Sequence, residues 1–268
     1  MTEKVTIGNC ELWHGDCREI LPTLPKNAAI VSDPPYGMAW VQVSPAQGKH
    51  SKNGGGRTGG STSKHYGATI TNDSEPFDPT HLLDWPYVIL WGSNHYSNKL
   101  PKGAALVWIK KAESCWGAFL SDAELAWSKH GVGVYCFRDY STGQADARRG
   151  LRAHPNQKPT SLMQWCVQRT PEYMPVIDAY MGSGATGLAC VEMGRPFYGI
   201  EIERRWFDAA CERIARAQAQ ERLFAEPKVG AGDTAVQGDM LLPANAKVSG
   251  AGTASAGLPG WQANGETE

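Results

Sequence analysis

The stretch PVIDAYMGSGATGLACVEM at residues 175–193 decides the fold. It begins with a short apolar run, continues through glycines at positions 182, 184 and 187, and ends in a second apolar run. We expect a strand, a tight turn and a helix in this order, because closely spaced glycines let the backbone turn and approach a ligand. The N-terminus of the helix that follows would favour negative charge. This unit is typical of open α/β sheets.

Similar apolar runs recur along the chain and predict further strands. They are continuous and do not alternate with polar residues, which is typical of strands covered on both faces in a largely parallel sheet. The expected strands are Ala28–Ser32, Tyr87–Trp91, Ala105–Ile109, Val132–Phe137, Pro175–Asp178 and Phe197–Glu201. The expected helices are Thr160–Arg169, Thr186–Met193 and Arg204–Arg222. Strands that alternate with helices indicate an open, doubly wound α/β fold.

Composition excludes several classes of protein. The chain has 268 residues, of which 41% are hydrophobic and 20% charged, as in a globular domain. No apolar run approaches the roughly 18–20 residues that span a bilayer, and the N-terminus lacks a secretory signal pattern. Seven cysteines without a CxxC pair indicate reduced thiols in a cytoplasm. We therefore expect neither a secreted, a membrane nor a collagen-like protein.

Two stretches interrupt the α/β pattern. Residues 37–72 contain no acidic residue and many glycines, so we expect a mobile basic loop at residues 44–68. The chain from residue 224 to residue 268 is rich in Gly and Ala and predicts a disordered tail. Residues 1–223 would then form one domain.

The string Asp33-Pro34-Pro35-Tyr36-Gly37 directly follows one of the apolar runs. Two prolines cannot continue a parallel ladder, so the strand must end here. The turn places a carboxylate and an aromatic ring at the carboxyl end of a strand, the edge where open α/β sheets bind ligands. The Asp33 carboxylate and the Pro34 carbonyl are both acceptors, which suits an amine with two N–H donors. Tyr36 can stack on a flat ring.

Two further features accompany the glycine turn. Glu201 ends the next expected strand and is placed to accept hydrogen bonds from ribose hydroxyls. A dehydrogenase that binds a dinucleotide would show the same glycines and the same acid, so these residues alone leave the cofactor open. The segment HPNQKPT at residues 154–160 precedes the next helix, and its Lys158 supplies a cation near the turn. In isolation it reads as a polar, proline-rich linker.

Together the three segments resemble the DNA amino-methyltransferases, which transfer a methyl group from S-adenosylmethionine to an exocyclic base nitrogen. DPPYG is similar to the family's D/N/S-P-P-Y catalytic motif, DAYMGSG at residues 178–184 to its DPFxGSG cofactor motif, and HPNQKP to its HPTQKP segment. The catalytic motif comes first, a permuted order similar to the family's beta subclass. The resemblance covers residues 12–213 and implies a Rossmann-like methyltransferase fold. It favours a methyltransferase over a dehydrogenase, because a dinucleotide fingerprint leaves DPPYG unexplained.

The resemblance assigns roles residue by residue. The base-handling positions are Asp33, Pro34, Pro35 and Tyr36, and the segment from Trp91 to Asn94 resembles one that lines the base pocket. The positions that bind S-adenosylmethionine are Asp16, Cys17, Asn156, Gln157, Lys158, Asp178, Tyr180, Gly182, Gly184 and Glu201. Two residues depart from the family pattern: Tyr180 replaces the usual Phe and Ala179 a common Pro. The added hydroxyl of Tyr180 needs a hydrogen-bond partner.

The expected reaction follows from the chemistry of the base. An exocyclic amine is conjugated with its ring, so hydrogen bonds to Asp33 and to the Pro34 carbonyl would favour a pyramidal nitrogen that can attack the sulfonium methyl in line. The target base must flip out of duplex DNA, where Tyr36 would stack on it. By resemblance, Asp33 favours the N6 amine of adenine. Methylation of cytosine N4, a DNA-binding module without catalysis and an RNA substrate stay open.

DNA affinity must come from local charge, because the formal net charge is −1. The expected contacts lie in the loop at residues 44–68 and in a target-recognition segment at residues 138–153: Lys49, Lys52, Arg57, Lys64, Arg148, Arg149 and Arg152. Lys110 and Lys111 are expected to add phosphate contacts. His14 near Cys10 and Cys17 lacks a fourth ligand, so we assign no metal. A homodimer, a role in restriction–modification and a location in the cytoplasm of a bacterial or phage-infected cell are further expectations from the resemblance.

Overall fold

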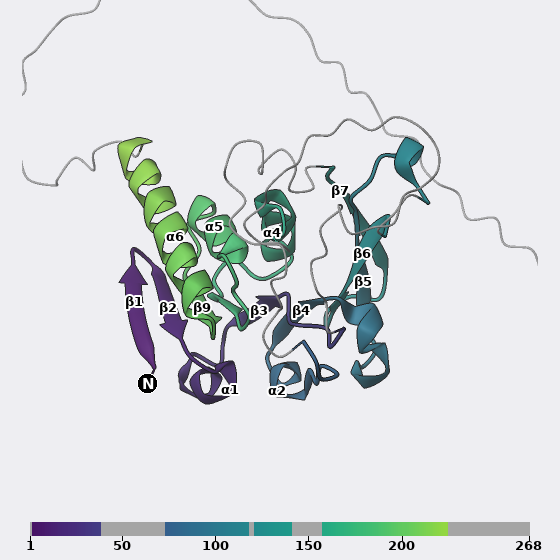
Figure 1. The fold of residues 1–268 in the computed structure, drawn as a ribbon, viewed down its shortest axis with the longest axis horizontal. Helices are drawn as coiled ribbons and strands as arrows, with labels where there is room; N and C mark the ends of the chain where they lie inside the picture. Colours follow the sequence, from purple (N-terminus) through teal and green to yellow (C-terminus); the bar gives the residue numbers. More distant parts are fainter. Residues whose placement is uncertain (1, 39–72, 118–120, 141–156, 225–268) are drawn as a thin grey trace, which may run out of the picture. The chain divides into compact units, whose positions relative to one another are not determined.

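The structure, a computed structural model, describes residues 2–38, 73–117, 121–140 and 157–224. Within these residues, nine strands form one sheet in the order β1-β2-β9-β8-β3-β4-β6-β5-β7 (Figure 1). The strands are β1 (Glu3–Ile7), β2 (Cys10–His14), β3 (Ala29–Ser32), β4 (Tyr87–Trp91), β5 (Ala104–Ile109), β6 (Ala123–Ser128), β7 (Val134–Arg138), β8 (Val176–Asp178) and β9 (Phe197–Glu201).

The direction of the strands decides which residues gather at one edge of the sheet. β2, β9, β8, β3 and β4 run parallel to one another. β6 is antiparallel to both β4 and β5, and β5 is parallel to β7. The carboxyl ends of all these strands except β6 therefore lie at the same edge, where β6 contributes its amino end. Open α/β sheets bind ligands at this edge.

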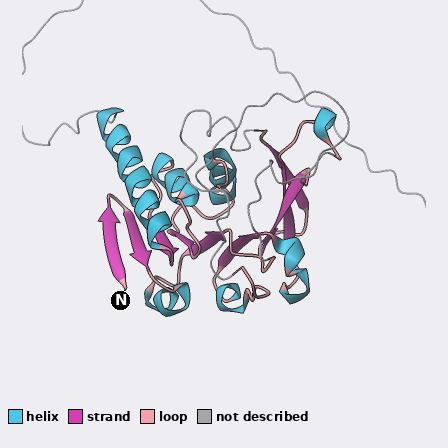
Figure 2. Cartoon of the chain, viewed as in Figure 1, coloured by secondary structure: helices cyan, strands magenta, loops and turns pink. Residues whose placement is uncertain are grey.

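Helices cover both faces of the sheet, as Figure 2 shows. One face carries α4 (Thr160–Val167), α5 (Ala185–Glu192) and α6 (Arg204–Phe224), and the other carries the short helices α1 (Cys17–Ile20) and α2 (Thr80–Leu83). Neighbouring residues of one strand pack on opposite faces: Val31 joins the cluster under α4, α5 and α6, whereas Ile30 joins the cluster with α1 and α2. Burial on both faces explains why these strands are apolar throughout.

The doubly wound α/β fold expected from the sequence is confirmed, with small shifts at element ends. The expected strand at residues 132–137 begins two residues later, and the helix expected at residues 160–169 ends at Val167. Three strands were not expected. β1 and β6 carry charged residues and run antiparallel to their neighbours, and β2 contains Glu11 and His14. Their polar residues hid them from a search for continuous apolar runs.

Several expected segments lie outside the described residues. They are the basic loop at residues 44–68, residues 141–153 of the target-recognition segment and residues 225–268 of the tail. Helix α6 ends at Phe224, the first residue of the expected tail. Among the described residues, no helix combines the length and apolar character that a membrane span requires.

Candidate active site

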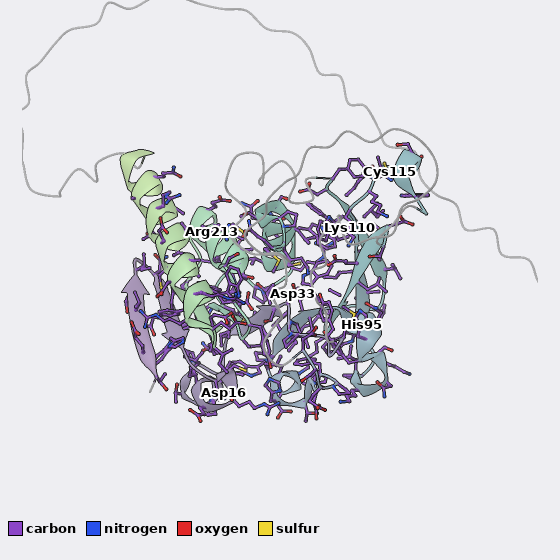
Figure 3. All side chains as sticks on the ribbon, viewed as in Figure 1. Asp16, Asp33, His95, Lys110, Cys115 and Arg213 are labelled. Atoms are coloured by element: carbon purple, nitrogen blue, oxygen red, sulfur yellow. The ribbon has the colours of Figure 1, made fainter. Side chains whose placement is uncertain are left out.

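The residues of the three motifs meet at the carboxyl edge of β3 and β8. Asp33 directly follows β3, and the glycine turn follows β8. A cavity of about 60 Å³ lies between them, with room for a few waters. Its lining residues are Asp33, Gln157, Lys158, Met163, Asp178, Tyr180, Met181, Gly182, Ser183, Ala185 and Thr186. Six residues expected at the site thus line one cavity, and Asp33 lies near the middle of the fold in Figure 3.

Both carboxylate oxygens of Asp33 accept hydrogen bonds. The Tyr36 hydroxyl donates to Oδ1, and the Lys158 ammonium donates to Oδ2 at 2.6 Å. The ammonium nitrogen also lies 3.4 Å from the Tyr36 hydroxyl oxygen. Lys158, which the resemblance assigns to the cofactor's amino-acid end, therefore contacts the expected catalytic carboxylate directly. The structure joins the DPPYG and HPNQKP motifs through this ion pair.

Lys158 is also the second member of a row of alternating charges. Its Nζ lies 3.1 Å from Glu124 Oε2, and Glu124 Oε1 accepts a hydrogen bond from Lys110 Nζ at 2.7 Å. Burial alone would lower the pKa of Lys158, but the Asp33 and Glu124 carboxylates outweigh it and hold this pKa well above its usual value. Burial would likewise raise the pKa of Glu124, yet Lys158 and Lys110 lower it to about 2. Lys158 and Glu124 are therefore both ionised at neutral pH.

The expected phosphate contacts of Lys110 and Lys111 are not supported by this geometry. Lys110 pairs with Glu124, and the Lys111 ammonium lies 3.0 Å from Asp122 Oδ1. Both lysines are mostly shielded, with side chains 16% and 15% exposed. Both lysines are held by carboxylates in this structure, and their contacts with phosphate stay a prediction.

Tyr36 is fixed by residues that follow β4. Its ring stacks on His95 with centroids 5.0 Å apart and an interplanar angle of 11°. A Cβ atom on Gly92 would lie only 1.9 Å from Tyr36 Cε1, and Gly92 has a φ of +72°. Glycine is required there both by the left-handed backbone and by the approach of the ring. Burial, followed by the Asp33 charge, raises the pKa of Tyr36 well above its usual value, so the phenol stays a donor.

Asp178 ties the ends of β3 and β8 to the start of α5. Its Oδ1 accepts from the Ser32 hydroxyl at 2.5 Å and from the Tyr180 N–H at 3.1 Å, while Oδ2 accepts from the Thr186 hydroxyl at 2.5 Å. Burial raises the pKa of Asp178 to about 6. This carboxylate positions the walls of the cavity, because every donor it receives comes from the protein around it.

The glycine turn has one open position and one packed position. Gly182 has a φ of +53°, and a Cβ atom there would meet no other atom within 4 Å. Gly184 has a φ of +81°, and its Cβ would lie 3.1 Å from the Cβ of Ala210 on α6. Gly182 therefore leaves space for a ligand to approach the backbone, whereas Gly184 lets α6 pack closely.

Glu201 supports this turn from the end of β9. Its Oε2 accepts the Gly182 N–H at 2.8 Å, and Oε1 accepts the Glu203 N–H at 2.7 Å. Burial raises the pKa of Glu201 to about 7. Each oxygen keeps a further lone pair, so the carboxylate can still accept from a ligand hydroxyl.

The remaining cofactor positions surround the turn. Tyr180 stands where the family usually has Phe, so its hydroxyl needs a hydrogen-bond partner. That partner is His81, whose Nε2 lies 3.1 Å from the hydroxyl. Burial raises the pKa of Cys17, although its hydrogen bond to Tyr180 opposes the shift. Asp16 is exposed and caps α1 by accepting the Arg18 N–H at 2.9 Å. The Ser183 hydroxyl lies 3.3 Å from Oε1 of Gln157.

For the other expected site residues, the structure gives only their burial or does not describe them. Pro34 is buried and Pro35 half-buried in the turn after β3. Asn156 and the seven expected DNA-contacting residues, Lys49, Lys52, Arg57, Lys64, Arg148, Arg149 and Arg152, lie outside the described residues. Among the residues that are described, no group of three His, Cys, Asp or Glu side chains is arranged to hold a metal ion.

Three site residues were missed by sequence reasoning. Glu124 lies in β6, which was not expected as a strand, and His95 follows the expected base-pocket segment by one residue. Arg213 of α6 donates to the carbonyl and, at 2.9 Å, to the hydroxyl of Ser183, which fixes the turn from behind. In Figure 3, Arg213 and Lys110 lie on either side of Asp33.

A comparison with known families matches the part of the chain that carries two of the three motifs. The family model described as DNA methylase, of the N6/N4 type, matches residues 84–212. Residues 84–212, just under half of the chain, are therefore similar to the N6/N4 DNA methylases. The matched region includes the HPNQKP segment, the glycine turn and Glu201.

Individual relatives are distant. The chain is 34% identical over 70 residues to the putative methylase YubD of Escherichia coli, a match that covers 26% of this chain and 31% of that protein. It is 21% identical over 252 residues to the type II methyltransferase M2.LlaDCHI of Lactococcus lactis subsp. cremoris, covering 77% of this chain and 89% of that one.

Solved structures of other methyltransferases are similar at low sequence identity. The M1.HpyAVI–SAM complex has a TM-score of 0.47 at 19% identity, with coverage of 76% of this chain and 99% of that one. The cytosine-N4-specific PvuII DNA methyltransferase has a TM-score of 0.48 at 15% identity, covering 80% and 93%.

Proposed function

We propose that this chain is a member of the N6/N4 DNA methylase family and transfers a methyl group from S-adenosylmethionine to an exocyclic amine of DNA, most directly N6 of adenine. The observation that carries the proposal is the cavity shared by Asp33, from DPPYG, and Gly182, from the glycine turn. An acceptor for an amine and a backbone open to a cofactor therefore lie side by side.

The residues of the turn fit S-adenosylmethionine. Gly182 offers backbone that no side chain covers, and Glu201 beside it has lone pairs for ribose hydroxyls. Gln157 and Ser183 line the same cavity and have polar atoms for an amino-acid group. When bound, the cofactor supplies an electrophilic methyl on its sulfonium.

The residues on the other side of the cavity fit the base. Asp33 accepts a hydrogen bond from the base amine and favours the pyramidal nitrogen that attacks the methyl. As the new N–C bond forms, the bond between the methyl group and sulfur breaks and its electron pair stays on sulfur. The nitrogen becomes cationic and releases one proton, for which Asp33 is the nearest acceptor at this site. Tyr36, held by Gly92 and His95, provides a flat wall for a base that has left the helix.

We propose in addition which base is methylated, which residues contact DNA and where in the cell the protein acts. Asp at the first motif position favours adenine by family resemblance; cytosine N4 presents the same pair of N–H donors and is the second candidate. The basic residues of segments 44–68 and 138–153 would neutralise DNA phosphates. We keep the homodimer, the cytoplasmic setting and the role in restriction–modification as proposals.

The sharpest test of the base is nucleoside analysis by mass spectrometry. DNA from cells that express the chain is compared with DNA from cells that express Asp33→Ala. We expect N6-methyladenine only with the unaltered chain. N4-methylcytosine would assign the second candidate, and no modified base in either sample would refute the proposed activity.

The affinity for S-adenosylmethionine should depend on pH through Glu201. Burial raises the pKa of this carboxyl to about 7, and ribose hydroxyls donate more strongly to the ionised form than to the protonated one. Protonation therefore opposes binding: affinity should be constant well above pH 7 and fall below it, by at most about tenfold per pH unit. Calorimetric titration of the unaltered chain and of Glu201→Gln from pH 5.5 to 8.5 measures this difference. Identical pH profiles would exclude Glu201 from the cofactor site.

A further inference from the structure

Glu124 belongs to no motif, yet only Lys158 separates it from the expected catalytic carboxylate in the row of charges. It lies at the amino end of β6, which the antiparallel direction of that strand brings to the carboxyl edge of its neighbours. Its Oε1 is held by Lys110. Its Oε2 is buried and lies 3.1 Å from the Lys158 ammonium, but outside hydrogen-bond geometry. Glu124 Oε2 therefore faces the Lys158 ammonium as an ion-pair partner and does not accept a hydrogen bond from it.

The substrate amine creates a conflict at Asp33. Lys158 holds Oδ2 at 2.6 Å and Tyr36 holds Oδ1, so a base amine that approaches Asp33 along either of these hydrogen bonds must displace its donor. Lys158 is only 7% exposed, so an ammonium displaced from Asp33 is largely shielded from bulk water. A buried ammonium that loses its partner is strongly destabilised, so Lys158 can leave Asp33 only toward another anion.

Glu124 is that anion, because its Oε2 already lies within reach. A small rotation about the end of the Lys158 side chain brings an N–H from Asp33 Oδ2 to Glu124 Oε2. Lys110 remains on Oε1 throughout, which keeps the Glu124 carboxylate charged and oriented. The exchange trades one charged hydrogen bond for another and leaves no buried charge unpaired.

We propose that Glu124 is a positioning residue for methyl transfer: it takes over the Lys158 ammonium when the base amine engages Asp33. This inference rests on the proposed function, because it concerns the same carboxylate and the same reaction. Glu124 itself touches neither substrate nor cofactor and acts through Lys158. A merely structural role would affect the stability of β6 and leave the methylation rate of the folded protein unchanged.

The first test is Glu124→Gln, which keeps the size of the side chain and removes its charge. With a neutral neighbour, Lys158 stays on Asp33, and the single-turnover rate on duplex DNA at saturating S-adenosylmethionine should fall by roughly 10–100-fold. Cofactor affinity should change by less than about twofold. Glu11→Gln, which breaks the surface ion pair with Lys4, is the matched control and should keep the full rate. An unchanged rate in folded Glu124→Gln, or an equal loss of cofactor affinity, would overturn the inference.

The second test asks whether Glu124 acts through Lys158. In Lys158→Met no ammonium has to move, so adding Glu124→Gln should slow single-turnover methylation by less than about twofold relative to Lys158→Met alone. A loss of tenfold or more in the Lys158→Met background would overturn the inference, and this comparison needs only the two proteins that carry Lys158→Met. Absence of methylation by the unaltered chain would instead refute the proposed function, so the two failures are distinguishable.

Discussion

Asp33→Ala should lower the single-turnover rate of DNA methylation by at least about 10²–10³-fold while leaving S-adenosylmethionine affinity within about twofold. Asp33 supplies the acceptor for the base amine, and its contribution is largest when the nitrogen becomes pyramidal. The cofactor side of the cavity is built by other groups, because Glu201 holds the Gly182 N–H and Asp178 holds the start of α5. The effect should therefore fall on turnover. The measurements are single-turnover methylation of duplex DNA and calorimetric binding of the cofactor.

Asp208→Ala is a suitable control, because this exposed aspartate pairs only with surface Arg204 in the described part of the chain. It should match the unaltered chain in both assays. Retained methylation by Asp33→Ala would remove Asp33 from the reaction. A parallel loss of cofactor binding would instead relocate its role to the cofactor pocket.

Gly92→Ala should both destabilise the protein and nearly abolish methylation. The added Cβ would lie 1.9 Å from the Tyr36 ring, so the ring must leave its position beside Asp33 and His95. The left-handed φ of +72° adds about 1 kcal/mol, and the overlap about 1–3 kcal/mol, to the loss in free energy of unfolding. Displacement of Tyr36 should slow single-turnover methylation by roughly 10²-fold.

Gly194→Ala separates these two costs. Gly194 has a similar φ of +64°, but a Cβ atom there meets no atom within 4 Å. It should lose only the backbone contribution, about 1 kcal/mol, and keep its methylation rate. Urea unfolding and single-turnover assays of both variants provide the comparison. If the two variants had equal stability and equal methylation rates, the close approach of Gly92 to Tyr36 would not be needed for the reaction.

The sequence predicts the parts of this molecule that depend on local order along the chain. A continuous apolar run followed by two prolines must end a strand, and β3 does end at Ser32, directly before Asp33. The glycines at positions 182 and 184 both adopt positive φ, as the turn requires. These features are set within a few residues, so a single sequence is enough to predict them.

Features that depend on strand pairing were not predicted. Glu124 reaches the site because β6 pairs antiparallel with β4 and β5, and no local pattern encodes that pairing. The same pairing gives Lys110 its carboxylate partner, which comes from the opposite strand and was not predicted. Lys158 was expected at the cofactor, but its ion pair with Asp33 joins residues 125 positions apart in the chain. Contacts at such separations follow from the folded sheet and not from residue type.

Transfer of labelled methyl groups tests the central claim most directly. Purified protein is incubated with unmethylated duplex DNA and S-adenosylmethionine that carries a labelled methyl group, and the digested nucleosides are separated. The account predicts label on the exocyclic amine of a base, chiefly N6 of adenine, and a loss of at least about 10²-fold in Asp33→Ala. Label on a ring carbon, or no label in DNA from a folded protein that binds the cofactor, would contradict it.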